Sequence, residues 1–95
     1  MHEWDEAERL ANLRKHGVDF VSVEAFFYWD PAITFEDTCD RYNEHKWVAF
    51  GPIGDMIFAL VFTEPEDGVT RVISLRRATK PERRLYAKEL EQARG

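Results

Sequence analysis

A run of seven consecutive apolar residues, Met56–Phe62, constrains the fold of this 95-residue chain more than any other feature. A Gly54-Asp55 turn precedes the run, and the polar segment 64–68, which contains Pro65 and Gly68, follows it. An apolar run of this length is too short to cross a membrane as a helix, and it is typical of a strand buried on both faces. We therefore predict a sheet with this strand at its centre and with other elements covering both faces.

The neighbouring segments alternate between apolar and polar residues, as strands do when one face is buried. We predict strands at Ile33–Glu36, at Lys46–Phe50, where Gly51-Pro52 ends the strand, and at Val69–Arg76. With the central run they form an antiparallel sheet of about four strands. A short strand or entry segment, Glu3–Asp5, precedes them in the chain.

Two helices are expected before the sheet and one after it. The first covers 5–16, with Asp5 as its N-cap and Gly17 ending it, and the second covers about 20–27. The apolar stripe of the first helix should face the core, with Ala7, Leu10, Ala11 and Leu13 on it, while Glu6, Glu8, Arg9 and Lys15 face water. The spacing Thr79-x-x-Glu82 is a capping box that opens the C-terminal helix.

These elements predict an α+β fold in a single domain covering residues 1–95, since the chain has room for only one core. Cys39 is the one cysteine, and the first residues do not resemble a secretory signal, so we expect a cytoplasmic protein with no membrane association. The histidines and the cysteine lack the spacing of a metal site, and no phosphate-binding glycine loop is present. We therefore expect neither a metal nor a cofactor.

Charge is divided unevenly along a chain whose net charge is −5. Residues 1–70 hold five Lys/Arg against fifteen Asp/Glu, whereas residues 71–95 hold eight against three, so the two parts carry −10 and +5. A basic end on an acidic protein suits a polyanionic partner, and an ordinary helix with a solvated face would give the same count.

Two arginines of the last predicted strand are the strongest candidates for binding an anion. In a regular strand Arg71 shares a face with Ile73 and Leu75, and Arg76 points to the other face. Arg76 leaves the strand just before the helix N-terminus at Thr79, where free amides attract anions, so a phosphate seat is expected there. The alternative is structural, with both arginines paired to carboxylates of the N-terminal half.

Two separated segments resemble the BrnT family of toxins. The first comprises Glu3-Trp4-Asp5 followed by residues 12–20 (NLRKHGVDF), and the second is residues 71–86 (RVISLRRATKPERRLY). They stand in the family's order and span nearly the whole chain. The resemblance implies a RelE-like fold, metal-independent RNA cleavage, and inhibition by a BrnA-like antitoxin with a ribbon-helix-helix domain, through which operator DNA is bound.

The resemblance also suggests roles for particular residues. Arg71 and Arg76 would stabilise the charge on the phosphorane, and Lys46 or Glu44 would act as the base. The remaining cations, Arg77, Lys80, Arg83 and Arg84, would bind flanking phosphates of the RNA. The acid stays unassigned, with His45 as one candidate.

Two departures from the family pattern weaken the catalytic interpretation. Relatives often carry Glu-x-Arg where this chain has Glu44-His45-Lys46, and an Arg soon after the position of Thr63, where this chain has Glu64. Two alternatives therefore stay open: a weak or inactive toxin that acts through antitoxin binding and operon autoregulation, and a nucleic-acid-binding domain unrelated to toxins.

Overall fold

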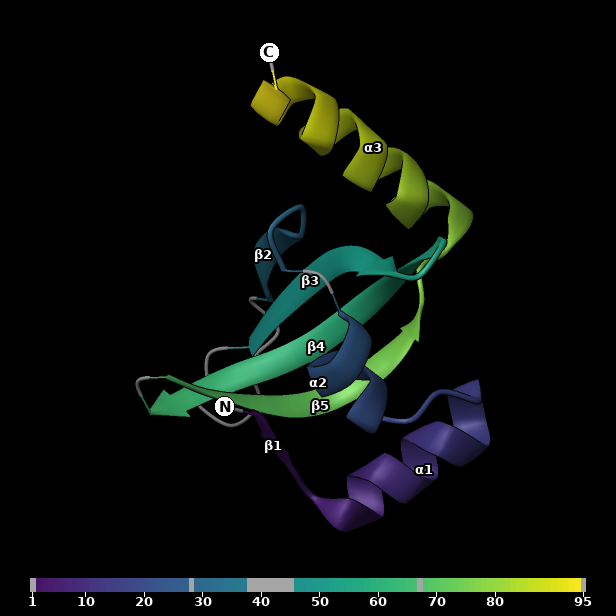
Figure 1. Ribbon diagram of the computed structural model, residues 1–95, viewed down its shortest axis with the longest axis vertical. Helices are drawn as coiled ribbons and strands as arrows, with labels where there is room; N and C mark the ends of the chain where they lie inside the picture. The colour runs from purple at the N-terminus through teal and green to yellow at the C-terminus, as the bar shows by residue number, and fades with distance from the viewer. Residues whose placement is uncertain (1, 28, 38–45, 67, 95) are drawn as a thin grey trace.

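The computed structural model describes residues 2–27, 29–37, 46–66 and 68–94. Along these segments the chain forms five strands and three helices (Figure 1). In chain order they are β1 (His2–Trp4), α1 (Glu6–His16), α2 (Val21–Phe26), β2 (Ile33–Asp37), β3 (Lys46–Ile53), β4 (Met56–Glu66), β5 (Val69–Arg77) and α3 (Lys80–Arg94).

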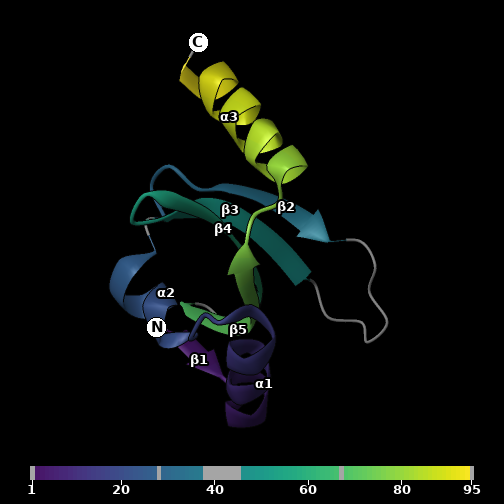
Figure 2. The ribbon, with the colours of Figure 1, turned by 90° about the vertical axis from the view of Figure 1, so that its right-hand side faces the viewer.

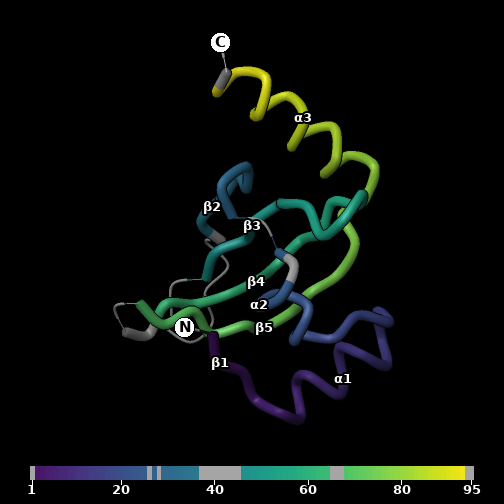
Figure 3. Tube along the Cα trace, viewed as in Figure 1, coloured from purple at the N-terminus to yellow at the C-terminus, as the bar shows by residue number. Residues whose placement is uncertain are grey.

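All five strands form one mixed sheet in the order β1-β5-β4-β3-β2. The pairs from β2 to β5 are antiparallel, as predicted, and the apolar β4 lies at the centre. The prediction of an antiparallel sheet of about four strands was incomplete, because β1 joins the edge parallel to β5, pairing His2–Trp4 with Thr70–Val72 (Figures 1 and 3). β1 can pair in parallel with β5 because α1 and α2 connect β1 to the antiparallel strands β2 to β5.

Each face of the sheet packs on a different helix, and Figure 2 shows α3 on one side of the sheet and α1 and α2 on the other. On one face the side chains of β4 and β5 pack with Phe20 and Val23 at α2; we call this the α2 face. On the opposite face Phe50 and Ala59 pack with Tyr86 of α3; we call this the α3 face. Burial of β4 on both faces confirms the prediction from its unbroken apolar sequence.

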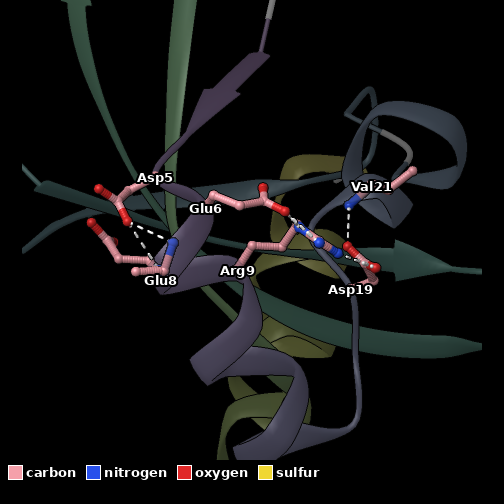
Figure 4. A network of polar contacts seen from close by, with 7 residues as sticks. Asp5, Glu6, Glu8, Arg9, Asp19 and Val21 are labelled. Atoms are coloured by element: carbon pink, nitrogen blue, oxygen red, sulfur yellow. Dashed lines mark hydrogen bonds and ion pairs between the residues drawn. The ribbon is translucent and has the colours of Figure 1, made fainter.

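Helix α1 is held by polar groups at both ends and along its inner side. The Asp5 carboxylate accepts hydrogen bonds from the amides of Ala7 and Glu8, which confirms the predicted N-cap. Gly17 ends the helix at φ 71°, a left-handed conformation that favours glycine. Arg9 pairs with Glu6 and, at 2.8 Å, with Asp19, which ties α1 to the segment before α2 (Figure 4).

The predicted apolar stripe of α1 does not face the core. Leu10 and Leu13 are 41% and 37% exposed, and the buried residue of this helix is Asn12. Arg9, which was expected in water, has a side chain only 20% exposed. The prediction was wrong because the inner face of α1 meets the backbone edge of β5, which requires hydrogen-bonding groups rather than methyl groups.

Asn12 supplies the hydrogen-bonding groups that the backbone edge of β5 requires. Its amide nitrogen donates to the carbonyls of Leu75 (2.7 Å) and Val18 (3.1 Å), and its oxygen accepts from the Leu75 amide (3.1 Å) and the Ser74 hydroxyl (3.3 Å). All four hydrogen-bonding positions of the side chain are used. Asn12 thus pairs with β5 just beyond the end of β1, and it fixes α1 against the sheet.

A β-bulge at Ile73 changes which residues of β5 share a face. Val61 pairs with Ser74 and Phe62 with Val72, so Ile73 has no partner of its own on β4. As a result Val72 and Leu75 both enter the core of the α2 face. Arg71 and Arg76 therefore share the α3 face, and the prediction from regular alternation that they point to opposite faces was wrong.

No helix of the described residues is long and apolar enough to cross a membrane.

Candidate functional site

Lys46, Thr63 and Arg71 form one row across the α3 face. Lys46 opposes Thr63 on β4, and Thr63 opposes Arg71 on β5. Neighbouring strands lie about 4.8 Å apart, so the backbones of the two cationic residues are roughly 10 Å apart with Thr63 between them. Long side chains can span that gap from both sides. We refer to these three residues as the basic row.

The basic row lies away from the part of the α3 face that α3 packs against. Tyr86 packs with Phe50, four residues further along β3 than Lys46, or roughly 13 Å at the rise of a strand. Thr63 is buried at 5% exposure, whereas Lys46 and Arg71 are partly exposed. The row therefore presents two partly exposed cationic side chains on either side of the buried Thr63.

Arg71 has a weak partner. Its Nη1 lies 3.9 Å from Oε1 of Glu3, the residue opposite it on β1, and the two side chains are 40% and 46% exposed. An exposed pair at this separation contributes little and yields readily to a stronger anion. Arg71 therefore pairs with a carboxylate of the N-terminal half, as the structural alternative held, but the pair is exposed and weak.

Arg76 has a strong partner. Its two terminal nitrogens donate to both oxygens of Glu82, at 2.6 and 2.9 Å, in a two-pronged pair whose side chains are 32% and 23% exposed. The hydrogen bonds from Arg76 lower the pKa of Glu82 from 4.5 to about 2, and the same pairing raises the pKa of Arg76. Arg76 is paired, as the structural alternative held, but its partner comes from α3 and not from the N-terminal half.

The capping box forms as predicted and also connects to Arg76. The Thr79 amide donates to Glu82 at 2.8 Å, and the Glu82 amide donates to the Thr79 hydroxyl at 3.3 Å. The carboxylate of Glu82 therefore occupies the position beside Arg76 and the Thr79 amide, just before α3, where the sequence predicted a phosphate. An anion could bind both groups there only by displacing Glu82.

The other predicted phosphate-binding cations lie at the start of α3 and the end of β5. Arg77, Lys80, Arg83 and Arg84 are all exposed. Arg83 donates to the carbonyl of Ala78 at 2.9 Å, which places its guanidinium against the helix start. These four cations are near one another in sequence and structure, and they lie at the opposite end of β5 from Arg71.

Two of the proposed catalytic residues cannot be placed. Glu44 and His45 lie outside the described residues, so their roles as base and acid stay predictions. Among the described residues no group of three or more His, Cys, Asp or Glu side chains could hold a metal ion.

Sequence reasoning missed a shallow pocket of about 220 Å³ between α1 and the bulge of β5. Lys15, His16 and Ser74 are among its lining residues. The sequence signal for it is the pair Asn12 and His16, two polar residues one helical turn apart that both line the pocket. Asn12 is structural, and the half-buried His16 borders the pocket.

Known proteins give a consistent picture. The model of a family described as ribonuclease toxin, BrnT, of type II toxin–antitoxin system matches residues 4–82. A crystal structure of the Brucella abortus ribonuclease toxin BrnT is 32% identical and superposes with a TM-score of 0.68, covering 84% of this chain and 99% of that one. No curated protein sequence matches the chain. The family match ends at Glu82, so α3 beyond its first turn lies outside it.

Proposed function

The chain belongs to the BrnT family of ribonuclease toxins of type II toxin–antitoxin systems, and we propose that it cleaves RNA at the basic row without a metal ion. The observation that carries the proposal is the bulge at Ile73, which puts Arg71 on the same face as Lys46 with Thr63 between them. A phosphate above Thr63 would be within reach of both cationic side chains.

The reaction is an attack by the ribose 2′-hydroxyl on its neighbouring phosphate. The base removes the hydroxyl proton, the new P–O2′ bond forms, and the P–O5′ bond breaks as an acid protonates the leaving 5′ oxygen. The products are a 2′,3′-cyclic phosphate and a free 5′-hydroxyl. Such a reaction needs cations that stabilise the charge on the phosphorane, and it needs no metal.

Arg71 suits the role of phosphorane stabiliser, because it is partly exposed and only weakly held by Glu3. Lys46 approaches from the other side of Thr63, and it or Glu44 serves as the base. Arg76 lies roughly 15 Å further along β5 than Arg71, at the rise of a strand. This distance and its pairing with Glu82 keep Arg76 from the scissile phosphate, and the flanking phosphates are bound by Arg77, Lys80, Arg83 and Arg84.

The partner that follows from this function is an antitoxin that covers the basic row. A toxin–antitoxin family implies an antitoxin and an RNA target, and the surface that the antitoxin covers is our proposal. We propose that the antitoxin is a BrnA-like protein with a ribbon-helix-helix domain, and that operator DNA is bound only through it.

A second function, partner binding with little or no cleavage, is favoured by the pairing of Arg76. Both terminal nitrogens of Arg76 are engaged by Glu82, and Lys46 stands where relatives often have arginine, whose planar fork binds phosphate in a two-pronged manner. On this account the chain binds its antitoxin and regulates its operon while leaving RNA intact.

One experiment separates the two functions. Purified protein is incubated with a long single-stranded RNA in EDTA, and the fragment ends are identified chemically. We expect cleavage with cyclic phosphate ends, a loss of at least a hundredfold in Arg71→Ala, and no change in Lys88→Ala, a cation of α3 outside the proposed site. Intact RNA with the wild-type protein, or activity that returns only with added metal, would contradict the proposal.

A further inference from the structure

The outward face of α1 is apolar at its centre and uncovered. Leu10 and Leu13 are among the most exposed large apolar residues of the described chain, and Ala7 and Ala11 beside them are exposed too. The opposite side of the helix is occupied by the contacts of Arg9 and Asn12. Contiguous apolar surface on one helix is typical of an interaction site, whereas single exposed residues are not.

Two residues of opposite charge on this face lie at equal distances from Leu10. Glu6 and Arg14 stand four residues before and four residues after it, so the three side chains form one ridge of the helix in steps of about 6 Å. The first turn of α1 is acidic and the last turn is basic. Along the ridge an acidic residue is followed by an apolar one and then by a basic one. A second ridge that runs in the opposite direction therefore places opposite charges against each other.

We propose that the occupant of this face is a second copy of the chain, with two α1 helices packed antiparallel about a twofold axis at Leu10. The axis places Leu10 against its own equivalent. It also places each Glu6 against Arg14 of the other copy, so two identical ion pairs flank the apolar centre. A twofold interface uses the same patch on both subunits, which requires this kind of self-complementarity.

The groups that this pairing needs are available. The Glu6 side chain is 63% exposed even though it pairs with Arg9 inside its own chain. The Arg14 side chain is exposed and makes no ion pair or hydrogen bond with the described residues. Ala7 and Ala11, beside Leu10, are small enough for two helix backbones to approach closely.

The dimer is expected to be weak. Helix α1 has 11 residues and is about 16 Å long, so the contact buries less than the roughly 1,200 Å² of a stable interface. We expect a dissociation constant in the micromolar range or above. The inference rests on α1 alone, so it holds or fails separately from the proposed RNA cleavage.

Sedimentation velocity from about 10 to about 500 μM tests the dimer, with these concentrations set by the expected affinity. The mass should rise from 11.2 kDa toward twice that value. Leu10→Asp should stay monomeric across the range, because it buries two carboxylates at the axis. Met56→Asp is the matched control, since Met56 is 43% exposed at the start of β4, and this variant should dimerise like the wild type. Circular dichroism checks that both variants are folded.

Charge exchange tests the antiparallel orientation. Glu6→Arg and Arg14→Glu should each lose self-association, and an equimolar mixture of the two should recover it as a heterodimer. A wild-type protein that stays monomeric throughout the range would overturn the proposal. So would a dimer that Leu10→Asp leaves intact, or a Leu10→Asp variant whose one defect is weaker binding to the antitoxin, which would make α1 a surface for that partner.

Discussion

Replacing Glu82 with glutamine isolates the contribution of the Arg76–Glu82 pair to stability. Glutamine keeps an oxygen that can accept the Thr79 amide, so the capping box loses its charge and not its shape. Arg76 then lacks the anion that holds both of its terminal nitrogens. The variant should unfold at a lower urea concentration than the wild type at pH 7.

The pKa of Glu82 gives the size of the effect. A fall from 4.5 in the unfolded chain to about 2 in the folded protein corresponds to at most about 3.4 kcal/mol. Water reaches one side of this pair and screens it, so we expect a loss of about 1–2 kcal/mol for Glu82→Gln. Glu91→Gln, an exposed site on the same helix, should change the free energy of unfolding by less than about 0.5 kcal/mol.

The effect should also depend on pH in a defined direction. Because folding lowers the pKa of Glu82, the carboxylate stabilises the folded state fully above about pH 5.5, and this stabilisation is lost as the pH falls from 4.5 toward 2. The stability difference between wild type and Glu82→Gln should therefore shrink by about half at pH 3. A difference that is equal at pH 7 and pH 3, or no larger than that of Glu91→Gln, would refute the reasoning.

Three further changes test the fold by urea denaturation. Asn12→Ala should destabilise the protein by about 3 kcal/mol, because it leaves the buried amide and carbonyl of Leu75 unpaired; a loss under about 1 kcal/mol would show that water replaces the side chain. Gly51→Ala should cost about 1–3 kcal/mol, since its Cβ would lie 2.7 Å from the ring of Phe27, and an unchanged midpoint would show that the ring moves freely. Asp5→Ala should cost about 1 kcal/mol by removing the N-cap of α1, whereas Asp5→Asn should be nearly neutral; equal losses in both would contradict the capping role.

The parts of the fold that the sequence predicts are those set by local patterns. The unbroken apolar run marks β4 as the central strand, and the Thr79–Glu82 spacing and Asp5 mark two helix starts that the structure confirms. Each signal depends on residues within one or two turns of the chain. Such signals predict an element without information on the order of the strands in the sheet.

The misplaced features depend on contacts between distant segments. Ile73 has an ordinary strand residue on each side, and nothing in its sequence marks the bulge that reverses the faces of β5. The burial of Asn12 follows from the position of Leu75, 63 residues away, whose backbone needs a partner where β1 has ended. Because Asn12 takes the inner side of α1 for this contact, Leu10 and Leu13 lie on the outer side and are exposed to solvent.

The bulge also changes what could be predicted of the site. Regular alternation separates Arg71 from Arg76, while the structure puts both on the α3 face and brings Lys46 into line with Arg71. The charge count predicted a basic end but not its division into two regions. One is the basic row, and the other is the start of α3, where Glu82 already occupies the anion position.

The central claim is that Arg71 acts on the scissile phosphate, and the most direct measurement is the single-turnover cleavage rate of RNA in EDTA for Arg71→Ala against wild type and Lys88→Ala. We predict a rate at least a hundredfold lower for Arg71→Ala, with unchanged unfolding in urea, and a wild-type rate for Lys88→Ala. A folded Arg71→Ala protein that cleaves RNA at the wild-type rate would contradict the claim.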